Sequence, residues 1–172
     1  QGILGIGDIG VGGMAVPIGK LSLYSIGAGI HPSFCLPIAL DVGTDNEELL
    51  QDPLYLGIGH KRIKGQEYYD LIDKFVNNIK EHFPKAIIQW EDFSKRHSFE
   101  ILDKYKEVLP SYNDDIQTTG AFVLAGIINA MKIKGEELKD QAFVVYGAGS
   151  GGIGVARNIC AELRNIGLDE KT

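Results

Sequence analysis

Two pairs of acidic residues stand where the chain leaves an extended segment. Glu91 and Asp92 follow an apolar run. Asp114 and Asp115 follow a second extended run. Ligands of open α/β sheets collect outside the carboxyl ends of the strands, and Mg²⁺ or Mn²⁺ takes oxygen ligands from a few carboxylates, water and substrate. The pattern therefore suits a divalent-metal site that includes Glu91, Asp92 and Asp115, although solvated loop residues would show the same pattern and both interpretations stay open.

Lys20 is a candidate catalytic lysine because of its surroundings. It is the only residue charged at neutral pH between Asp8 and Asp41. A lysine in apolar surroundings is expected to have a lowered pKa, as general-base and Schiff-base lysines do. The alternative is a lysine that extends from a partly buried helix to the surface. The catalytic role gains support if Asp114 holds and orients the amine.

A glycine-rich segment lies between an expected strand and an expected helix. Residues 147–152 read Gly-Ala-Gly-Ser-Gly-Gly and satisfy the pattern G-x-G-x-x-G. Gly147 would permit a tight turn, and Gly149 would let the backbone approach a pyrophosphate. Gly152 would allow the helix to pack closely on the strand. Ser150 opens the helix, whose N-terminus would face the phosphates. This context favours dinucleotide binding over a structural turn, and the acidic residue that separates NAD from NADP is expected beyond this segment of chain.

The elements that must position these residues alternate between strands and helices. Strands are expected from Ile3 and at Leu36–Val42, Ala86–Trp90 and Ala142–Tyr146. Helices are expected at Met14–Ile30, Tyr68–Phe83, Ser98–Lys106 and Gly120–Met131, and from the glycine motif to about Asn165. Apolar side chains recur at helical spacing in the second of these helices, which Pro84 ends. The first helix is expected to be buried because it is apolar, and Ser98 is expected to cap the third.

This alternation predicts an α/β fold. Residues 1–117 are expected to form part of a metal- and substrate-binding catalytic α/β domain. Residues 118–172 are expected to form the first βα unit of a Rossmann-like dinucleotide-binding domain. The chain opens within an apolar strand and without an initiator methionine, so we expect it to be a piece of a longer protein.

Composition narrows the classes of ligand. The 172 residues are 44% hydrophobic and 23% charged, which is typical of a globular protein. A formal charge of -6 without a Lys/Arg block argues against a nucleic-acid or membrane partner. Cys35 and Cys160 have no close Cys or His neighbours, so we expect free, buried thiols in a reducing compartment. The expected location is cytoplasmic, or the mitochondrial matrix in a eukaryote.

Six segments, in the same order along the chain, resemble the malic enzyme family. They are Ile3–Asp8, Pro17–Leu21, Leu40–Thr44, Asp52–Tyr55, Trp90–Phe93 and Asn113–Gln117. The resemblance covers essentially the whole chain, and the ordered set is far more specific than any one segment. It implies oxidative decarboxylation of L-malate to pyruvate and CO₂ with NAD or NADP and Mn²⁺ or Mg²⁺, in a full-length protein that forms a homo-oligomer.

The resemblance also implies a role for each candidate residue. Lys20 would take the proton from the C2 hydroxyl of malate, and Asp114 would partner the lysine. Glu91, Asp92 and Asp115 would bind the cation, with Asp115 also beside the dinucleotide. Hydride would pass from C2 to the nicotinamide, and the cation would polarise the resulting carbonyl as a Lewis acid. A tyrosine that acts as general acid is expected upstream of this chain, so the chain alone is expected to be inactive.

Two positions depart from the family pattern. Gly2 stands where malic enzymes usually place an arginine that holds the substrate carboxylate, and the sister malolactic enzymes have glycine there. Malolactic activity, which converts malate to lactate and CO₂ with NAD and Mn²⁺, is therefore the second interpretation. Thr118 stands where both groups usually have glycine, and its side chain would lie near Asp115. A non-catalytic nucleotide-binding relative is the third interpretation.

Overall fold

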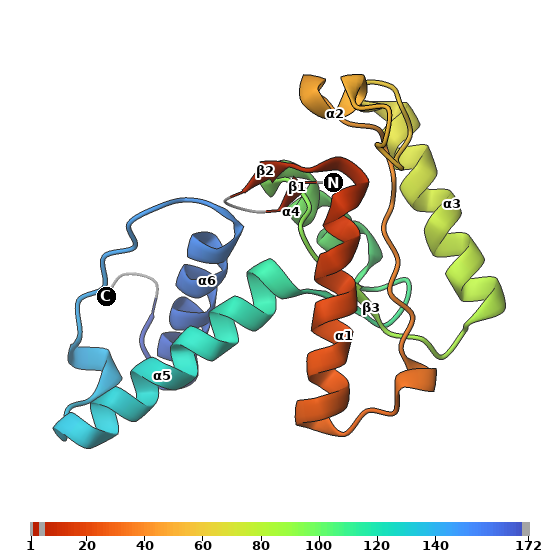
Figure 1. The fold of residues 1–172 in the computed structure, drawn as a ribbon. Coiled ribbons are helices and arrows are strands. Elements are labelled where there is room, and N and C mark those ends of the chain that lie inside the picture. Colours follow the sequence, from red (N-terminus) through yellow and green to blue (C-terminus); the bar gives the residue numbers. More distant parts are fainter. Residues whose placement is uncertain (1, 4–5, 170–172) are drawn as a thin grey trace. The chain divides into compact units, whose positions relative to one another are not determined.

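The computed structural model describes residues 2–3 and 6–169 and forms two compact units (Figure 1). The first unit comprises Gln1–Ala86 and Asp92–Ser94, and the second comprises Ile87–Glu91 and Lys95–Thr172. The structure combines helices with short strands, two of which form a parallel pair, and this confirms the predicted α/β class. The units divide near residue 86, and the domain boundary expected between residues 117 and 118 stays a prediction.

The first unit is built around one amphipathic helix. It contains β1 (Gly2–Ile3), β2 (Gly7–Asp8), η1 (Gly10–Met14), α1 (Ala15–Ala28), η2 (Pro32–Phe34), α2 (Glu47–Gln51) and α3 (Gln66–His82). Helix α3 buries Tyr68, Ile72 and Val76, which are spaced four residues apart and share one face. The predicted amphipathic helix is therefore confirmed.

Helix α1 forms as expected but its predicted burial is wrong. None of its residues is buried, and the side chains of Leu23 and Ile26 are 66% and 85% exposed. Its apolar residues point all round the helix, whereas its main neighbours are the short turns η1 and η2. Gly29 ends the helix in the left-handed conformation, with φ +69°.

The strand predicted at residues 36–42 does not form. All of these residues are described, and they lie in irregular backbone. Pro37 lacks an N–H and Gly43 turns the chain with φ +82°, so no regular ladder continues here. Instead, two backbone hydrogen bonds join this segment to residues 60–63. Ile63 N–H donates to Val42 O at 3.0 Å, and Thr44 N–H donates to His60 O at 3.0 Å.

The second unit contains the parallel strand pair. Its elements are β3 (Ile88–Trp90), α4 (Lys95–Tyr105), β4 (Ser111–Asn113), the π-helical turn η3 (Asp114–Thr118), α5 (Thr119–Lys134), η4 (Leu138–Asp140) and α6 (Ser150–Asn165). Trp90 pairs with Asn113 at the last position of the β3–β4 ladder. The indole of Trp90 packs on the ring of Tyr105, 5.9 Å between centroids, and both residues are buried. Strand β3 confirms the extended segment predicted to end at Trp90.

Ser98 does not cap its helix, because α4 begins three residues earlier, at Lys95. The Ser98 side chain is completely buried within the helix. Its hydroxyl donates to the Lys95 carbonyl oxygen at 3.2 Å and lies 3.1 Å from the Ser150 hydroxyl. Ser98 therefore joins α4 to the first residue of α6.

The strand predicted at residues 142–146 is also absent, although the helix after it forms as predicted. The segment is fully described, and no other described strand pairs with it. The Val144 and Tyr146 side chains are exposed. A strand exists only through its hydrogen-bonded neighbours, so the sequence preference for extended backbone does not suffice here.

Helices α5 and α6 pack side by side in the second unit (Figure 1). A Cβ built on Gly120 of α5 would lie 2.6 Å from the carbonyl oxygen of Gly154 in α6. By length and composition, the stretch Asp114–Lys134 is the one among the described residues that could cross a membrane. It begins with two carboxylates and packs on α6 through Gly120, as a helix of a globular α/β domain does.

Candidate functional site

The two acidic pairs follow neighbouring parallel strands. Trp90 and Asn113 are paired in register, so Glu91 and Asp114 leave the same edge of the β3–β4 pair. This confirms the predicted extended segment before each pair. Asp114 is buried and Asp115 is half-buried, on consecutive positions of η3. Carboxylates at the carboxyl ends of parallel strands are the donor type that a hard divalent cation requires.

Hydrogen bonds hold the backbone and side chains around this edge. The Tyr112 hydroxyl donates to Gln89 Oε1 at 2.7 Å, and Gln89 Nε2 donates to Glu91 Oε2 at 3.2 Å. Asn113 is completely buried, and its Oδ1 accepts a hydrogen bond from the Ile116 N–H at 3.0 Å. These contacts orient Glu91 on one strand and cap the acidic turn on the other.

The three-carboxylate site stays a prediction. Among the described residues, no group of three or more His, Cys, Asp or Glu side chains is arranged to hold a metal ion. Asp92 belongs to the first unit, whereas Glu91 and Asp115 belong to the second. Asp92 has φ +58°, a left-handed conformation that is uncommon outside glycine. The sharp turn therefore lies directly after Glu91.

The glycine motif has the backbone that close approach to a phosphate requires. Gly147 has φ +114°, which side chains disfavour. A Cβ on Gly152 would overlap the Gly147 carbonyl oxygen and lie 3.6 Å from Val145 Cγ1. Gly149 is the extended residue before α6. Gly147 and Gly152 are thus positions where the fold requires glycine, and the turn leads into the helix N-terminus, where a pyrophosphate could bind.

Ser150 contributes to this turn through its backbone. Its side chain is 3% exposed, and its hydroxyl lies against that of Ser98. Its N–H is one of the first of α6, which have no partner within the helix. Direct contact of Gly147, Gly149, Ser150 and Gly152 with a dinucleotide stays a prediction.

The acidic turn η3, which carries Asp114 and Asp115, packs against the start of helix α6. A Cβ on Gly154 would overlap the Ile116 carbonyl oxygen and lie 2.8 Å from the Ile116 carbonyl carbon. A Cβ on Gly151 would lie 3.6 Å from the Asp115 carbonyl oxygen. Sequence analysis missed Gly154, which follows the G-x-G-x-x-G motif by two positions. The surplus of small residues at the start of α6 was the available signal.

Lys20 lies in the second turn of α1 and is half-buried. It makes at least one polar or electrostatic contact in the structure. Lys20 belongs to the first unit and Asp114 to the second, so their pairing stays a prediction. Sequence analysis also missed Asp8, which precedes α1 and whose carboxylate accepts hydrogen bonds from Gly10, Asp45 and Arg62.

The positions that depart from the family pattern have ordinary surroundings. Thr118 is exposed and has φ -67° and ψ -46°, a conformation open to any residue, so the backbone does not require glycine there. Gly2 pairs with Asp8 in the β1–β2 ladder.

Cys35 and Cys160 are free thiols, as expected. Cys35 is half-buried and Cys160 is exposed, so the predicted burial of both is wrong. Cys160 points away from the buried side of α6, which carries Ile159.

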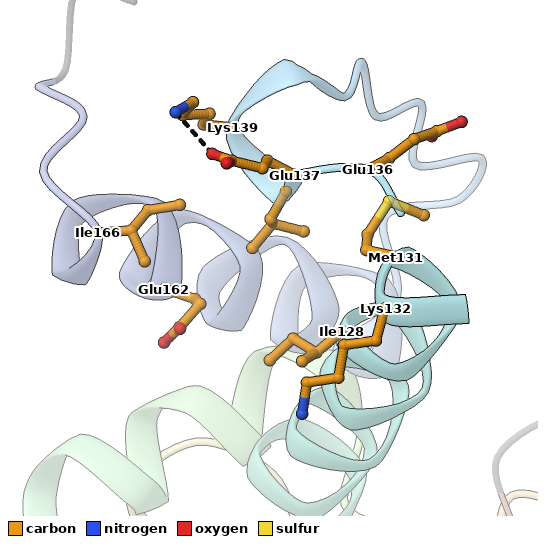
Figure 2. Close-up of a pocket in the computed structure, with 9 residues that line it drawn as sticks. Ile128, Met131, Lys132, Glu136, Glu137, Lys139, Glu162 and Ile166 are labelled. Atoms are coloured by element: carbon orange, nitrogen blue, oxygen red, sulfur yellow. Dashed lines mark ion pairs between the residues drawn. The ribbon is translucent and has the colours of Figure 1, made fainter. Parts of the chain in front are cut away.

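A shallow pocket also lies in the second unit, between α5, η4 and α6 (Figure 2). Ile128, Met131 and Ile166 give it apolar walls. An ion pair between Lys139 and Glu137, 2.6 Å apart, lies at its rim. The pocket contains none of the predicted site residues.

Comparisons with known proteins cover both units. Residues 1–106 match the family model described as malic enzyme, N-terminal domain, and residues 116–172 match malic enzyme, NAD binding domain. The chain is 49% identical over 170 residues to a malolactic enzyme of Leuconostoc mesenteroides, with 99% of the chain covered, and 50% identical over 171 residues to one of Lactiplantibacillus plantarum. It is 46% identical over 169 residues to an NAD-dependent malic enzyme of Proteus mirabilis, with 98% of the chain covered. The chain spans only 30–31% of the length of these relatives.

Proposed function

The chain belongs to the malic enzyme family, and from this we propose that it is part of an NAD-dependent enzyme that oxidatively decarboxylates L-malate to pyruvate and CO₂. NAD is proposed over NADP because the second family model is an NAD binding domain and relatives at 45–46% identity are named NAD-dependent malic enzymes. A divalent cation, Mn²⁺ or Mg²⁺, is proposed as the second cofactor.

One observation carries the proposal. The glycine turn at the start of α6 and the acidic turn η3 are packed against each other within a single unit. A cation bound at Asp115 would therefore lie close to a dinucleotide bound at Gly147–Gly152. Transfer of hydride from a metal-bound hydroxy acid to a nicotinamide needs this proximity.

The proposed roles divide between proton transfer and cation binding. Lys20 would accept the proton of the C2 hydroxyl, and Asp114 would orient the Lys20 amine. Glu91, Asp92 and Asp115 would hold the cation, with Glu91 oriented by the Gln89 amide. When bound, the cation would supply Lewis-acid polarisation of the C2 oxygen, and NAD would accept the hydride. The carbonyl formed at C2 lies β to a carboxylate, so loss of CO₂ becomes possible.

Malolactic activity is the second candidate, and two observations favour it. Gly2 stands where malic enzymes usually have a substrate-binding arginine. The malolactic relatives are 49% and 50% identical to the chain, compared with 45–46% for the NAD-dependent malic enzymes. The two reactions share the steps at C2 and differ in whether the reduced nicotinamide is released or used to reduce the three-carbon product.

Product analysis of the full-length protein tests the proposal. The protein is incubated with L-malate and Mn²⁺, and with NAD or NADP in turn. Pyruvate with an equal amount of reduced NAD supports the malic reaction, whereas lactate without reduced cofactor supports the malolactic reaction. Absence of CO₂ release under all conditions, in protein that still binds NAD, would reject both in favour of a non-catalytic relative. Omitting Mn²⁺ and Mg²⁺ is the control and should abolish turnover.

We also propose an assembly state and a location for the full-length protein. The exposed apolar residues of α1 are consistent with a homo-oligomer of the full-length protein, which sedimentation velocity would test. Free cysteines are consistent with a reducing, cytoplasmic location or with the mitochondrial matrix.

A further inference from the structure

Asp8 accepts hydrogen bonds from several other parts of the first unit. Its Oδ1 accepts the Gly10 N–H at 3.0 Å, and its Oδ2 accepts the Asp45 N–H at 2.8 Å and Arg62 Nε at 2.8 Å. Its backbone carbonyl accepts the Asn46 side-chain amide at 3.0 Å. One residue thus joins three stretches of chain that are separated by up to 54 positions.

The Asp8–Arg62 ion pair is shielded from solvent. Its side chains are 22% and 20% exposed, unlike the surface pairs of the same unit. The Arg62 guanidinium, together with the backbone donors, holds the pKa of Asp8 well below its usual range. The carboxylate is therefore ionised at neutral pH, and its hydrogen bonds are charge-assisted.

A second contact fixes the turn that follows Asp8. The Tyr55 hydroxyl accepts the Val11 N–H at 3.0 Å. A Cβ on Gly10 would overlap this hydroxyl and lie 2.8 Å from Tyr55 Cζ. Gly10 also has φ +53°, so the turn needs glycine for its conformation and for its close approach to the tyrosine.

The anchored turn continues into α1 without a break. Met14 ends η1 and is the N-cap of α1, with helical φ -58° and ψ -23°. The direction of α1 is therefore set by the residues that Asp8 and Tyr55 hold. Lys20 lies five positions after Ala15, within two turns of the anchor.

We propose that Asp8, paired with Arg62, is a positioning residue for the Lys20 amine. This inference rests on the proposed function, in which Lys20 is the proton acceptor. Asp8 touches neither substrate nor cofactor in this proposal. It holds the glycine turn, and the turn sets where the second turn of α1 presents its lysine. General-base catalysis depends on such placement, and a misplacement of about 1 Å can cost on the order of 100-fold in rate.

A double-mutant cycle in the full-length protein tests the inference. The single variants are Asp8→Asn, Arg62→Gln and Lys20→Ala, and the double variants combine Lys20→Ala with each of the other two. The enzyme concentration is high enough for the residual turnover of the Lys20→Ala variants to be measured. Asp8→Asn and Arg62→Gln should each lower kcat roughly 10- to 100-fold while KM for malate changes less than about 2-fold. In the Lys20→Ala background the same changes should lower kcat less than about 2-fold, because they act through the lysine.

Two further measurements separate positioning from general stability. Hydrogen exchange should quicken in η1 and the first turns of α1 in Asp8→Asn, without global unfolding. Lys61→Gln removes the exposed pair with Glu47 from the same loop and should leave kcat unchanged. If Asp8→Asn fails to fold, Tyr55→Phe removes only the second anchor and should show the same dependence on Lys20.

The outcomes distinguish this inference from the proposed function. Loss of activity in Lys20→Ala together with normal kcat in Asp8→Asn overturns the positioning role alone. Equal losses from Asp8→Asn in both backgrounds also overturn it, because Asp8 would then act independently of Lys20. Full activity in Lys20→Ala would reject Lys20 as the proton acceptor and the positioning role with it. The proposed function itself would be rejected only by absence of malate turnover in the wild-type full-length protein.

Discussion

The substitution Gly154→Ala tests whether the acidic turn η3 and helix α6 form one packed body. The added methyl group would overlap the Ile116 carbonyl oxygen and lie 2.8 Å from its carbonyl carbon and 3.0 Å from its Cα. Methyl carbons pack against such atoms at about 3.5–4.0 Å. All three obstructing atoms belong to backbone, so no side chain can rotate away.

The helix and the turn must therefore separate by roughly 1 Å. Overpacking of this kind costs about 1–3 kcal/mol, so the Tm of the full-length protein should fall. Asp115 directly precedes Ile116, so the shift also moves a proposed cation ligand. Disturbing the residues that support a metal ligand typically costs about 10- to 100-fold in metal affinity.

Two measurements test this. Isothermal titration calorimetry of the full-length protein with Mn²⁺ gives the metal affinity, and thermal unfolding in the absence of metal gives Tm. The matched control is Gly126→Ala in α5, where an added Cβ meets no atom within 4 Å. This control should keep Mn²⁺ affinity and gain about 0.5–1 kcal/mol, because alanine is the better helix former. A Gly154→Ala protein with unchanged Tm and unchanged Mn²⁺ affinity would refute the argument for a packed pair of turns.

Three other predictions concern Lys20, Asp115 and Asp8. Lys20→Ala in the full-length protein should lower kcat by two or more orders of magnitude with unchanged Mn²⁺ affinity, measured by steady-state kinetics and calorimetry; unchanged turnover would exclude Lys20 as the base. Asp115→Ala should instead weaken Mn²⁺ binding at least about 10-fold in the same titration, and an unaltered Kd would count against its ligand role. The pKa of Asp8 is lowered on folding by its bond to Arg62, so its contribution to stability is present above the usual value of 3.8 and lost as pH falls below it. Urea unfolding should therefore show Asp8→Asn less stable than wild type at pH 7, with the difference shrinking below pH 3.8, whereas a constant difference would contradict the assignment.

Local patterns in the sequence predicted several elements correctly. The apolar spacing of Tyr68, Ile72 and Val76 predicts α3, and the glycines before Ser150 predict the start of α6. The acidic pairs after extended segments predict the edge of the β3–β4 pair. Each of these signals depends on residues within a few positions of one another, where backbone conformation and periodicity are decided.

The tertiary structure alone decided which segments become strands and which side chains are buried. Residues 36–42 and 142–146 have strand-like sequences, yet no ladder forms, because a strand requires a partner elsewhere in the fold. Helix α1 is apolar but not buried, since burial depends on what packs against it. Neither outcome is encoded in the segment itself.

The contacts most relevant to the candidate site also join distant residues. Asp8 meets Arg62 across 54 positions, and Gly154 meets the Ile116 backbone from a separate helix. The sequence by itself predicted the chemical groups, namely Lys20, the carboxylates and the glycine turn. Their supports emerge only when the chain folds, because hydrogen bonds and close packing are set by distance in space and not by separation along the chain.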